Sequence, residues 1–274
     1  MQTQDGSTAG GYLRATVAYD GADFLGFQWQ PAGRTVQGVL EAALAQVTRT
    51  ATRVVGSGRT DSGVHAQGQV IAFHAAWRHP IADLHRALNA VLPADVVLWD
   101  LRPAPLTWHP RFSALWRHYR YTVLNQPLRS PLDRRYAHQI AQPLDLAAMQ
   151  AAAALLVGEH DFASFGQPPQ GDSTVRRLFD ARWHTDGSWF TFDVVGNAFL
   201  RGMVRRLVST LLYVGAGVWS VDRVAEILAS RDRALAAPPA PACGLCLMHV
   251  EYDTRPCDFE TGDVIKEQGK RENL

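Results

Sequence analysis

The sequence predicts an α+β fold built from two consecutive ferredoxin-like halves, each with the element order β-α-β-β-α-β. Alternating apolar residues, typical of strands, and apolar residues at helical spacing follow one another in the same order twice along the chain. The length of 274 residues fits about two domains, and 47% hydrophobic with 19% charged residues is typical of a well-cored chain. We expect one extended, mostly antiparallel sheet with a central cleft.

The first half is expected over residues 12–108, after a disordered N-terminus at 1–11. Apolar residues alternate from Leu13 to Tyr19 as in a strand, and Thr35 can cap the helix that follows. Pro93 ends a second helix. The predicted elements are a strand at 13–19, a helix at 36–47, a strand at 52–55, a Gly-rich loop at 56–68, a strand at 70–73, a helix at 81–91 and a strand at 96–101.

The second half is expected over 109–252 and is followed by a polar tail at 253–274 that we expect to be disordered. Asp186-Gly187 is a typical hairpin turn. Along 175–184, strict alternation places Phe179 on the same face as Trp183. The predicted elements are a strand at 117–124, a helix at 146–156, strands at 175–184 and 189–195, helices at 199–214 and 222–228, a Pro/Ala linker at 235–241 and a strand at 245–251.

The 27 basic and 26 acidic residues nearly balance, which excludes a histone-like polycation but allows local clusters of charge. Only Lys266 and Lys270 are lysines, so Arg supplies the other 25 basic residues. A codon bias toward Arg explains this total equally well, whereas position is more informative. One window holds a single acid and is interleaved with aromatic residues, as is typical of a surface that binds RNA phosphates and bases. Its basic residues are Arg102, Arg111, Arg117, Arg120, Arg129, Arg134 and Arg135.

Several classes of protein and site are excluded. No apolar run approaches the roughly 18 residues of a membrane span, and the first residues lack the apolar stretch of a secretory signal, so we expect a cytoplasmic protein without membrane contact. Three cysteines form no disulfide framework. Cys243, Cys246 and His249 have a spacing that suggests zinc, but Cys246 alternates with core residues on a predicted strand, so we expect no metal.

The densest group of reactive side chains lies in the Gly-rich loop from Gly58 to Ala66, which reads Gly58-Arg59-Thr60-Asp61-Ser62-Gly63-Val64-His65-Ala66. Loops between strands often carry function, but Asp61 could equally cap the backbone of an ordinary polar turn. The pattern of a phosphate-binding loop is absent. A metal site at Asp61 and His65 lacks a third ligand nearby.

This loop resembles the signature of the TruA family of tRNA pseudouridine synthases. Further segments resemble that family's motifs and occur in its order across about residues 12–252. They are Tyr19-Asp20-Gly21, Gly26-Phe27-Gln28, Thr35-Val36-Gln37-Gly38, Arg111-Phe112-Ser113-Ala114, Arg117-His118-Tyr119-Arg120-Tyr121, Gly158-Glu159-His160-Asp161-Phe162, Phe199-Leu200-Arg201-Gly202-Met203-Val204-Arg205 and Gly244-Leu245.

The resemblance implies an isomerase that detaches the base of a uridine from C1′, turns it and rejoins it through C5, without a cofactor. It implies that Asp61 is the catalytic carboxylate. The other implied site residues bind the substrate: Tyr119 as the ring on the target base, Arg205 as the partner of the carboxylate, and Arg59 and Leu245. From the residues alone, Tyr121 rivals Tyr119 on the same strand face, and Arg201 and Arg206 rival Arg205 on one helix.

The resemblance also implies a partner, namely the anticodon stem-loop of tRNA at uridines 38, 39 and 40, and a homodimer that shares one tRNA. Three alternatives remain at this point. They are a pseudouridine synthase acting on another RNA, a non-catalytic RNA-binding module, and a carboxylate-dependent hydrolase, which would need a second acid near Asp61.

Overall fold

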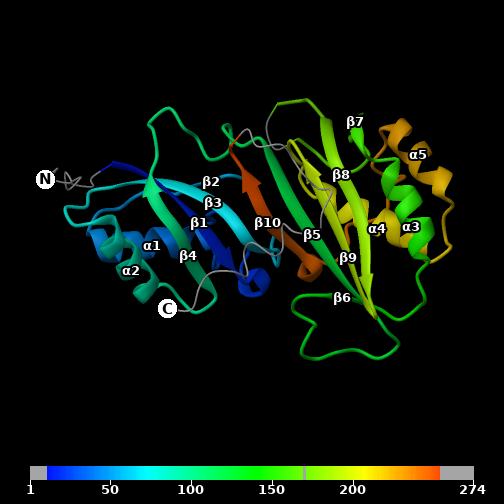
Figure 1. Ribbon diagram of the computed structural model, residues 1–274, viewed down its shortest axis with the longest axis horizontal. Helices are drawn as coiled ribbons and strands as arrows, with labels where there is room; N and C mark the ends of the chain where they lie inside the picture. The colour runs from blue at the N-terminus through cyan, green and yellow to red at the C-terminus, as the bar shows by residue number, and fades with distance from the viewer. Residues whose placement is uncertain (1–10, 169–170, 254–274) are drawn as a thin grey trace, which may run out of the picture.

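The computed structural model describes residues 11–168 and 171–253 (Figure 1). Strands and helices are interspersed along the whole described chain. The strands are β1 Gly11–Tyr19, β2 Val55–Gly56, β3 His65–Ala75, β4 Val96–Pro103, β5 Trp116–Asn125, β6 His138–Ile140, β7 Gly158–Asp161, β8 Val175–Asp186, β9 Trp189–Gly196 and β10 Leu245–Glu251. The helices are α1 Val36–Thr48, α2 Ile81–Val91, α3 Leu146–Ala154, α4 Met203–Gly215 and α5 Val221–Ser230.

One sheet runs through the molecule, with the strands in the order β4-β1-β3-β10-β5-β9-β8-β7; β2 pairs with β3 and β6 with β5. Two of the pairings, β3 with β10 and β5 with β6, are parallel, and the others are antiparallel. In Figure 1 the red-orange strand β10 lies between β3 and β5, where the two halves meet. The mixed α+β class and the large, mostly antiparallel sheet confirm the coarse fold prediction.

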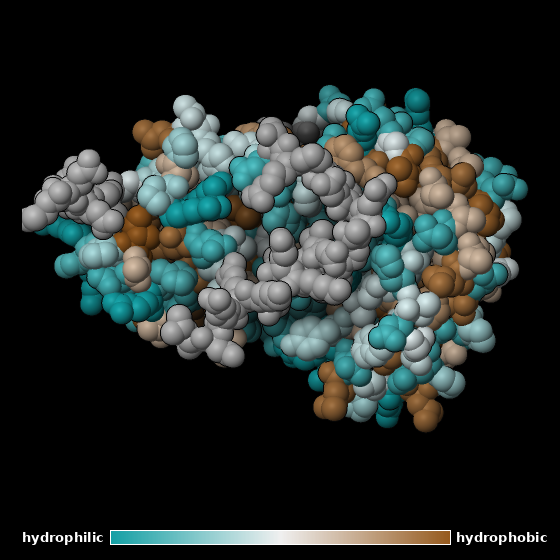
Figure 2. Space-filling model, in the orientation of Figure 1, coloured by the Kyte–Doolittle hydropathy of each residue, from teal (hydrophilic) through white to brown (hydrophobic). Residues whose placement is uncertain are grey.

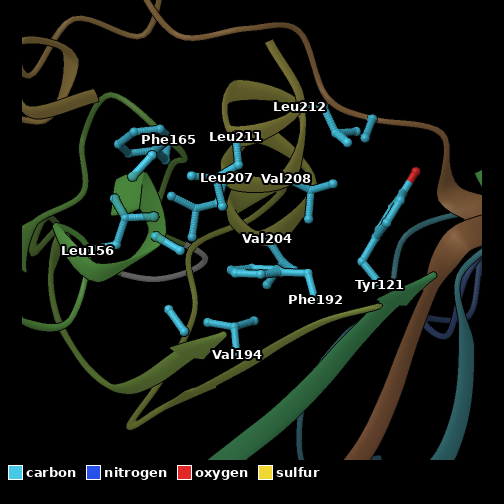
Figure 3. Close-up of a cluster of buried hydrophobic side chains, with 14 of the residues drawn as sticks. Tyr121, Leu156, Phe165, Phe192, Val194, Val204, Leu207, Val208, Leu211 and Leu212 are labelled. Carbon is cyan, nitrogen blue, oxygen red and sulfur yellow. The ribbon is translucent and has the colours of Figure 1, made fainter. Parts of the chain in front are cut away.

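Helices α1 and α2 lie beside the strands of the first half, and α3, α4 and α5 beside those of the second (Figure 1). Each helix group covers its own hydrophobic cluster. Figure 3 shows the hydrophobic cluster of the second half, in which Phe192 and Val194 of β9 face Leu207 and Val208 of α4. Within the described residues, no helix has the length and apolar character that crossing a bilayer requires.

Helix α4 begins at Met203 instead of at residue 199, because Gly202 adopts φ +73° and interrupts the helical backbone. The prediction that Arg201 and Arg205 share a helix is therefore wrong. Arg201 precedes the helix and forms an isolated bridge with Gln167. Of these two arginines, Arg205 alone lies on α4, so their side chains are not one turn apart on a common helix face.

The prediction that side chains alternate strictly between the two faces of β8 is also wrong, because the register with β9 shifts between Leu178 and Asp180. The shift reverses the faces upstream of it, so Leu178 is buried and Phe179 is exposed. Strand β3 begins at His65, inside the segment expected to be a loop to Gly68, because polar residues there pair with neighbouring strands. Strands β6 and β7 were not predicted, since both are short.

The remaining differences are small shifts of element ends. Strand β2 lies three residues beyond the predicted start of 52, and α3 ends at Ala154 instead of 156. Gly11 already belongs to β1, so the strand begins one residue inside the segment expected to be disordered. The predictions for residues 1–10 and 254–274, including Cys257, Lys266 and Lys270, lie outside the described residues.

A charged network ties β5 to β9 on the sheet face opposite the helices. Asp193 of β9 accepts hydrogen bonds from Arg120 Nε at 2.9 Å and Nη2 at 3.0 Å, and its Oδ1 lies 2.6 Å from His118 Nε2. Burial alone raises the pKa of Asp193, but hydrogen bonds from His118 and Arg120 outweigh burial and hold the pKa below its ordinary value. The carboxylate therefore stabilises the join between these strands in its ionised form.

We predict that Asp193→Asn lowers the free energy of unfolding at pH 7 by about 3 kcal/mol, because it removes a buried carboxylate and leaves the half-buried side chains of Arg120 and His118 facing a neutral amide. The folded-state pKa lies below the unfolded value, so this stabilisation is present above about pH 4 and disappears as the pH falls through the folded-state pKa. Urea titrations at pH 7 and at pH 3 measure both effects. Glu226→Gln, which breaks an exposed pair with Arg223, is the control and should change stability by less than about 1 kcal/mol.

Candidate active site

The loop that carries Asp61 is fixed to the segment between β1 and α1. The Thr60 Oγ1 and Tyr19 Oη atoms lie 2.8 Å apart in a buried hydrogen bond, and Phe27 N donates to Thr60 O at 3.1 Å. On the other side of Asp61, Gly63 N donates to Phe24 O at 3.3 Å. Hydrogen bonds on both sides of Asp61 hold its backbone in one position.

Close approach of these two segments depends on glycine. A Cβ on Gly21 would lie 1.9 Å from Val64 O, and one on Gly26, which has φ +93°, would lie 2.7 Å from Thr60 O. The start of the loop is supported by Gln69, which is fully buried: its Oε1 accepts from Ser57 Oγ at 2.6 Å and its Nε2 donates to Gly58 O at 3.0 Å. The motifs around residues 19–28 and 58–66 therefore form one packed unit.

The carboxylate of Asp61 meets a guanidinium from the other half of the chain. Arg205 Nη1 lies 3.3 Å from Asp61 Oδ2, and Arg205 Nε donates to Ala240 O at 2.6 Å. The Asp61 side chain is 35% exposed and that of Arg205 is 21% exposed, so solvent and a ligand can reach the pair. A partly exposed carboxylate held beside a cation can act as a nucleophile or as a general base.

The two sequence rivals of Arg205 point elsewhere. Arg206 Nη1 donates to Ala237 O at 3.0 Å, and Arg201 lies on the connection before α4. Of the three arginines, the structure brings Arg205 to Asp61.

Tyr119 and Tyr121 share one face of β5 but have different surroundings. Tyr121 is fully buried, and its hydroxyl donates to Pro241 O at 2.8 Å, so it belongs to the core (Figure 3). Tyr119 is partly exposed and packs edge-on against Phe199 with 5.1 Å between ring centroids. Burial raises the pKa of Tyr119 to about 12, while the Arg117 cation lowers that pKa and the Asp61 carboxylate raises it by smaller amounts. Its hydroxyl is therefore protonated at neutral pH.

The two other predicted site residues differ in their surroundings. Arg59 is exposed on the loop beside Thr60, and within the described residues no hydrogen bond or ion pair involves its side chain. Leu245 is 6% exposed at the start of β10, directly across from Tyr121. Leu247, two residues further on, lies across from Tyr119. Leu245 therefore belongs to the apolar wall beneath the tyrosines, whereas Arg59 is available to a ligand.

The sequence named Arg117 only as one member of the basic window and of a family motif, without a role of its own at the site. It lies two residues before Tyr119 on the same face of β5, a position that period-two alternation could have revealed. Its guanidinium donates to Asn197 O and to Arg111 O, each at 2.7 Å, and makes longer contacts of 3.4 Å to Ala114 O and Ser57 O. Burial lowers its pKa. One cation thus ties together three loops near Tyr119.

The basic window from Arg102 to Arg135 is only partly available to a ligand. Arg117 binds carbonyl groups, Arg120 binds Asp193, and Arg135 binds Asp20 and Asp23 at 3.0 and 2.7 Å. The exposed members are Arg102, Arg129 and Arg134. His65 is buried, with Nδ1 accepting from Gly21 N at 3.0 Å and Nε2 lying 2.8 Å from Arg135 O.

A hollow of about 460 Å³ lies close to this site but does not include Asp61, Tyr119 or Arg205. Its lining includes Arg120 and Thr122, which alternate with the core-facing tyrosines of β5 and so lie on the opposite sheet face.

No three His, Cys, Asp or Glu side chains gather as metal ligands anywhere in the described part of the chain.

A family model described as tRNA pseudouridine synthase matches residues 15–113 and 152–253. The two segments include Asp61, Arg205 and Leu245. The chain belongs to this family. Pseudouridine synthases rearrange a nucleoside without changing its composition, so the chain is an isomerase.

Curated relatives agree with this membership. The chain is 48% identical over 240 residues to a tRNA pseudouridine synthase A of Roseiflexus sp. (strain RS-1), covering 86% of this chain and 88% of the relative. It is 44% identical over 245 residues to a protein of the same name from Geobacter sp. (strain M21), covering 88% and 98%. A crystal structure of a Cbf5-Nop10-Gar1 complex aligns with a TM-score of 0.32 and 14% identity over 73% of this chain and 45% of that one, a likeness too weak to support an argument.

We predict that Arg205→Met lowers the rate of single-turnover pseudouridine formation by about a hundredfold, because it removes the only cation in hydrogen-bond contact with Asp61 in the described part of the chain. Arg205→Lys should be intermediate, since it keeps the charge but cannot contact Ala240 O and Asp61 together. Arg206→Met is the matched control from the next position on α4. Equal losses in the Arg205→Met and Arg206→Met enzymes would contradict a specific role for the pair.

We also predict that Arg117→Met lowers the free energy of unfolding by about 2–4 kcal/mol, because it leaves the carbonyls of Asn197 and Arg111 without their buried donor. Thermal and urea denaturation measure the change. Arg102→Met is the control on the exposed end of β4 and should have little effect. A change below about 0.5 kcal/mol in Arg117→Met would show that the four contacts do not hold the loops.

Proposed function

We propose that the protein converts uridine to pseudouridine in the anticodon stem-loop of tRNA, at positions 38, 39 and 40, with Asp61 as its catalytic group. The observation that carries the proposal is the Asp61–Arg205 contact, which joins the loop of one half to the helix of the other at 3.3 Å. Family membership supports the reaction, and relatives named tRNA pseudouridine synthase A support tRNA as the substrate.

Asp61 supplies the reactive carboxylate. Arg205 holds this carboxylate in position, with Nη1 at 3.3 Å from Asp61 Oδ2. Attack on C1′, attack on the base and removal of a sugar proton are each steps that a carboxylate in this position can perform. The product is an isomer of the substrate, so the overall reaction needs neither an oxidant nor a reductant, and we propose that no cofactor takes part.

Tyr119 binds the target base from the floor of the cleft. Its ring is held edge-on by Phe199, and its protonated hydroxyl can donate a hydrogen bond to a base or a sugar oxygen. Leu245 completes the apolar wall, and exposed Arg59 contacts the nucleotide that has left its stack. These roles are consistent with a pocket that encloses one flipped nucleotide beside Asp61.

Each half of the chain is a ferredoxin-like unit. When β6 and β7 are left aside, the strands of both halves pair in the relative order fourth, first, third, second: β4-β1-β3-β2 and β10-β5-β9-β8.

The protein acts as a homodimer in the cytoplasm. Figure 2 shows hydrophobic residues at the tip of the segment that joins β5 to β6, where Leu128 and Leu132 are 79% and 88% exposed. Such exposed apolar residues are available for contact with a second copy.

We predict that Asp61→Asn abolishes pseudouridine formation while leaving tRNA affinity nearly unchanged. Asn keeps the size and turn-forming capacity of Asp but lacks its charge and nucleophilicity. Affinity rests on many phosphate contacts distributed over the surface and depends little on this one acid. Single-turnover assays on a tRNA transcript measure the reaction, and filter binding measures affinity.

A thermal melt of the Asp61→Asn protein controls for folding, and unfolding should occur within a few degrees of the wild type. Ser62→Ala is the neighbouring control: it removes only the hydrogen bond from Ser62 Oγ to Phe24 O at 3.1 Å and should keep most of the activity. A folded Asp61→Asn protein with near-normal turnover would overturn the catalytic assignment. Binding of tRNA by the wild type without any reaction would instead favour the non-catalytic RNA-binding module.

A further inference from the structure

The loop from His109 to Ala114 is held firmly next to β5. Tyr252 Oη donates to Pro110 O at 2.6 Å, and Arg117 donates to Arg111 O at 2.7 Å. Within the loop, Ser113 N donates to His109 O at 2.9 Å, and His109 N donates to Ser113 Oγ at 3.0 Å. Anchors from β5, from the residue that follows β10 and from the loop itself fix its shape.

On this firmly held loop, the ring of Phe112 is 71% exposed. The His109 ring covers one side of it, with 4.5 Å between ring centroids and 35° between the ring planes. His109 Nδ1 accepts from the backbone N–H of Arg111 at 3.1 Å, which fixes the imidazole beneath the phenyl ring. Burial and the Arg111 cation lower the pKa of His109, so this ring is neutral at neutral pH. The Phe112 ring is therefore exposed to solvent, and the loop and the His109 ring that hold it are fixed in place.

One cation lies beside this ring. The Arg111 guanidinium is 5.4 Å from the Phe112 ring centroid. Burial, and then the Arg111 charge, lower the pKa of Arg176 at the start of β8, so a second guanidinium lies within electrostatic reach of Arg111. A flat apolar face beside a guanidinium fits a nucleotide, whose base stacks and whose phosphate is attracted by the cation.

We propose that Phe112 is a stacking platform for an unpaired base of the bound RNA, close to the nucleotide that reacts at Asp61. The inference rests on the proposed function and assigns a second RNA contact to that same cleft. Arg117 links the two places, because it donates both to Arg111 O and to Ser57 O. Ser57 precedes Asp61 by four residues, a span of at most about 14 Å, which a short run of nucleotides covers.

The platform binds the base and has no part in bond making, so its loss should act on binding. We expect Phe112→Ala to raise KM for an anticodon stem-loop about tenfold or more, with kcat changed less than about twofold. Phe112→Trp should keep the wild-type KM, because a larger aromatic face still stacks. Leu106→Ala is the matched control, since Leu106 is 80% exposed in the same connection between β4 and β5 but lies outside the anchored loop.

Photocrosslinking locates the contact directly. A stem-loop carrying 5-iodouridine at each loop position in turn is irradiated with the wild-type enzyme, and the linked peptide is identified by mass spectrometry. A crosslink to Phe112 from a position other than the reacting uridine supports the proposal.

Three results would overturn it: an unchanged KM in Phe112→Ala, crosslinks to other residues only, or a raised KM accompanied by dissociation of an oligomer in sedimentation. The last result would assign Phe112 to a contact between copies of the chain. Failure of the proposed function is distinguishable, because the wild-type enzyme would then form no pseudouridine in the stem-loop.

Discussion

The site depends on the position of β10, which pairs with β3 of the first half on one side and with β5 of the second half on the other. These pairings join strands from both halves into one sheet. The strands that carry Tyr119 and Leu245 are therefore joined by backbone hydrogen bonds and cannot slide without breaking the sheet. This constraint brings Asp61, which follows β2 in the first half, within 3.3 Å of Arg205 on α4 in the second.

The two arginines of the site have different partners. Arg205 is paired with Asp61, whereas half-buried Arg117 donates to carbonyl oxygens of three loops. A guanidinium bound to carbonyls keeps its full positive charge, while one bound to a carboxylate is neutralised. Arg117 therefore does two things at once: it fixes the loops, and it leaves a positive potential close to Tyr119. That potential favours an approaching phosphate chain over a neutral ligand.

Much of the fold could be predicted because its elements have strong hydrophobic periods: α1, α2, β4, β5 and β9 lie within two residues of their expected bounds. The start of β3 could not be predicted, because Gln69 is polar yet fully buried. Its burial depends on hydrogen bonds that only the folded chain makes. The same holds for α4, where one left-handed glycine moved the helix start beyond Arg201. For the site, the loop of Asp61 stood out by its composition, and the family resemblance selected Arg205. The residues alone could not separate Arg205 from Arg206, because that choice depends on the helix rotation that tertiary packing sets.

The Arg-rich window shows why composition alone is a poor guide to a binding surface. Three of its members, Arg117, Arg120 and Arg135, are engaged by carbonyls or carboxylates of the protein itself. Their charges hold β5 and the loop after it in place instead of meeting a ligand. What remains for RNA is a smaller set of exposed cations combined with exposed aromatic surface. Because a polyanion is attracted by any cation but a base stacks only on an accessible flat face, Phe112 carries more information about where RNA lies than the number of arginines does.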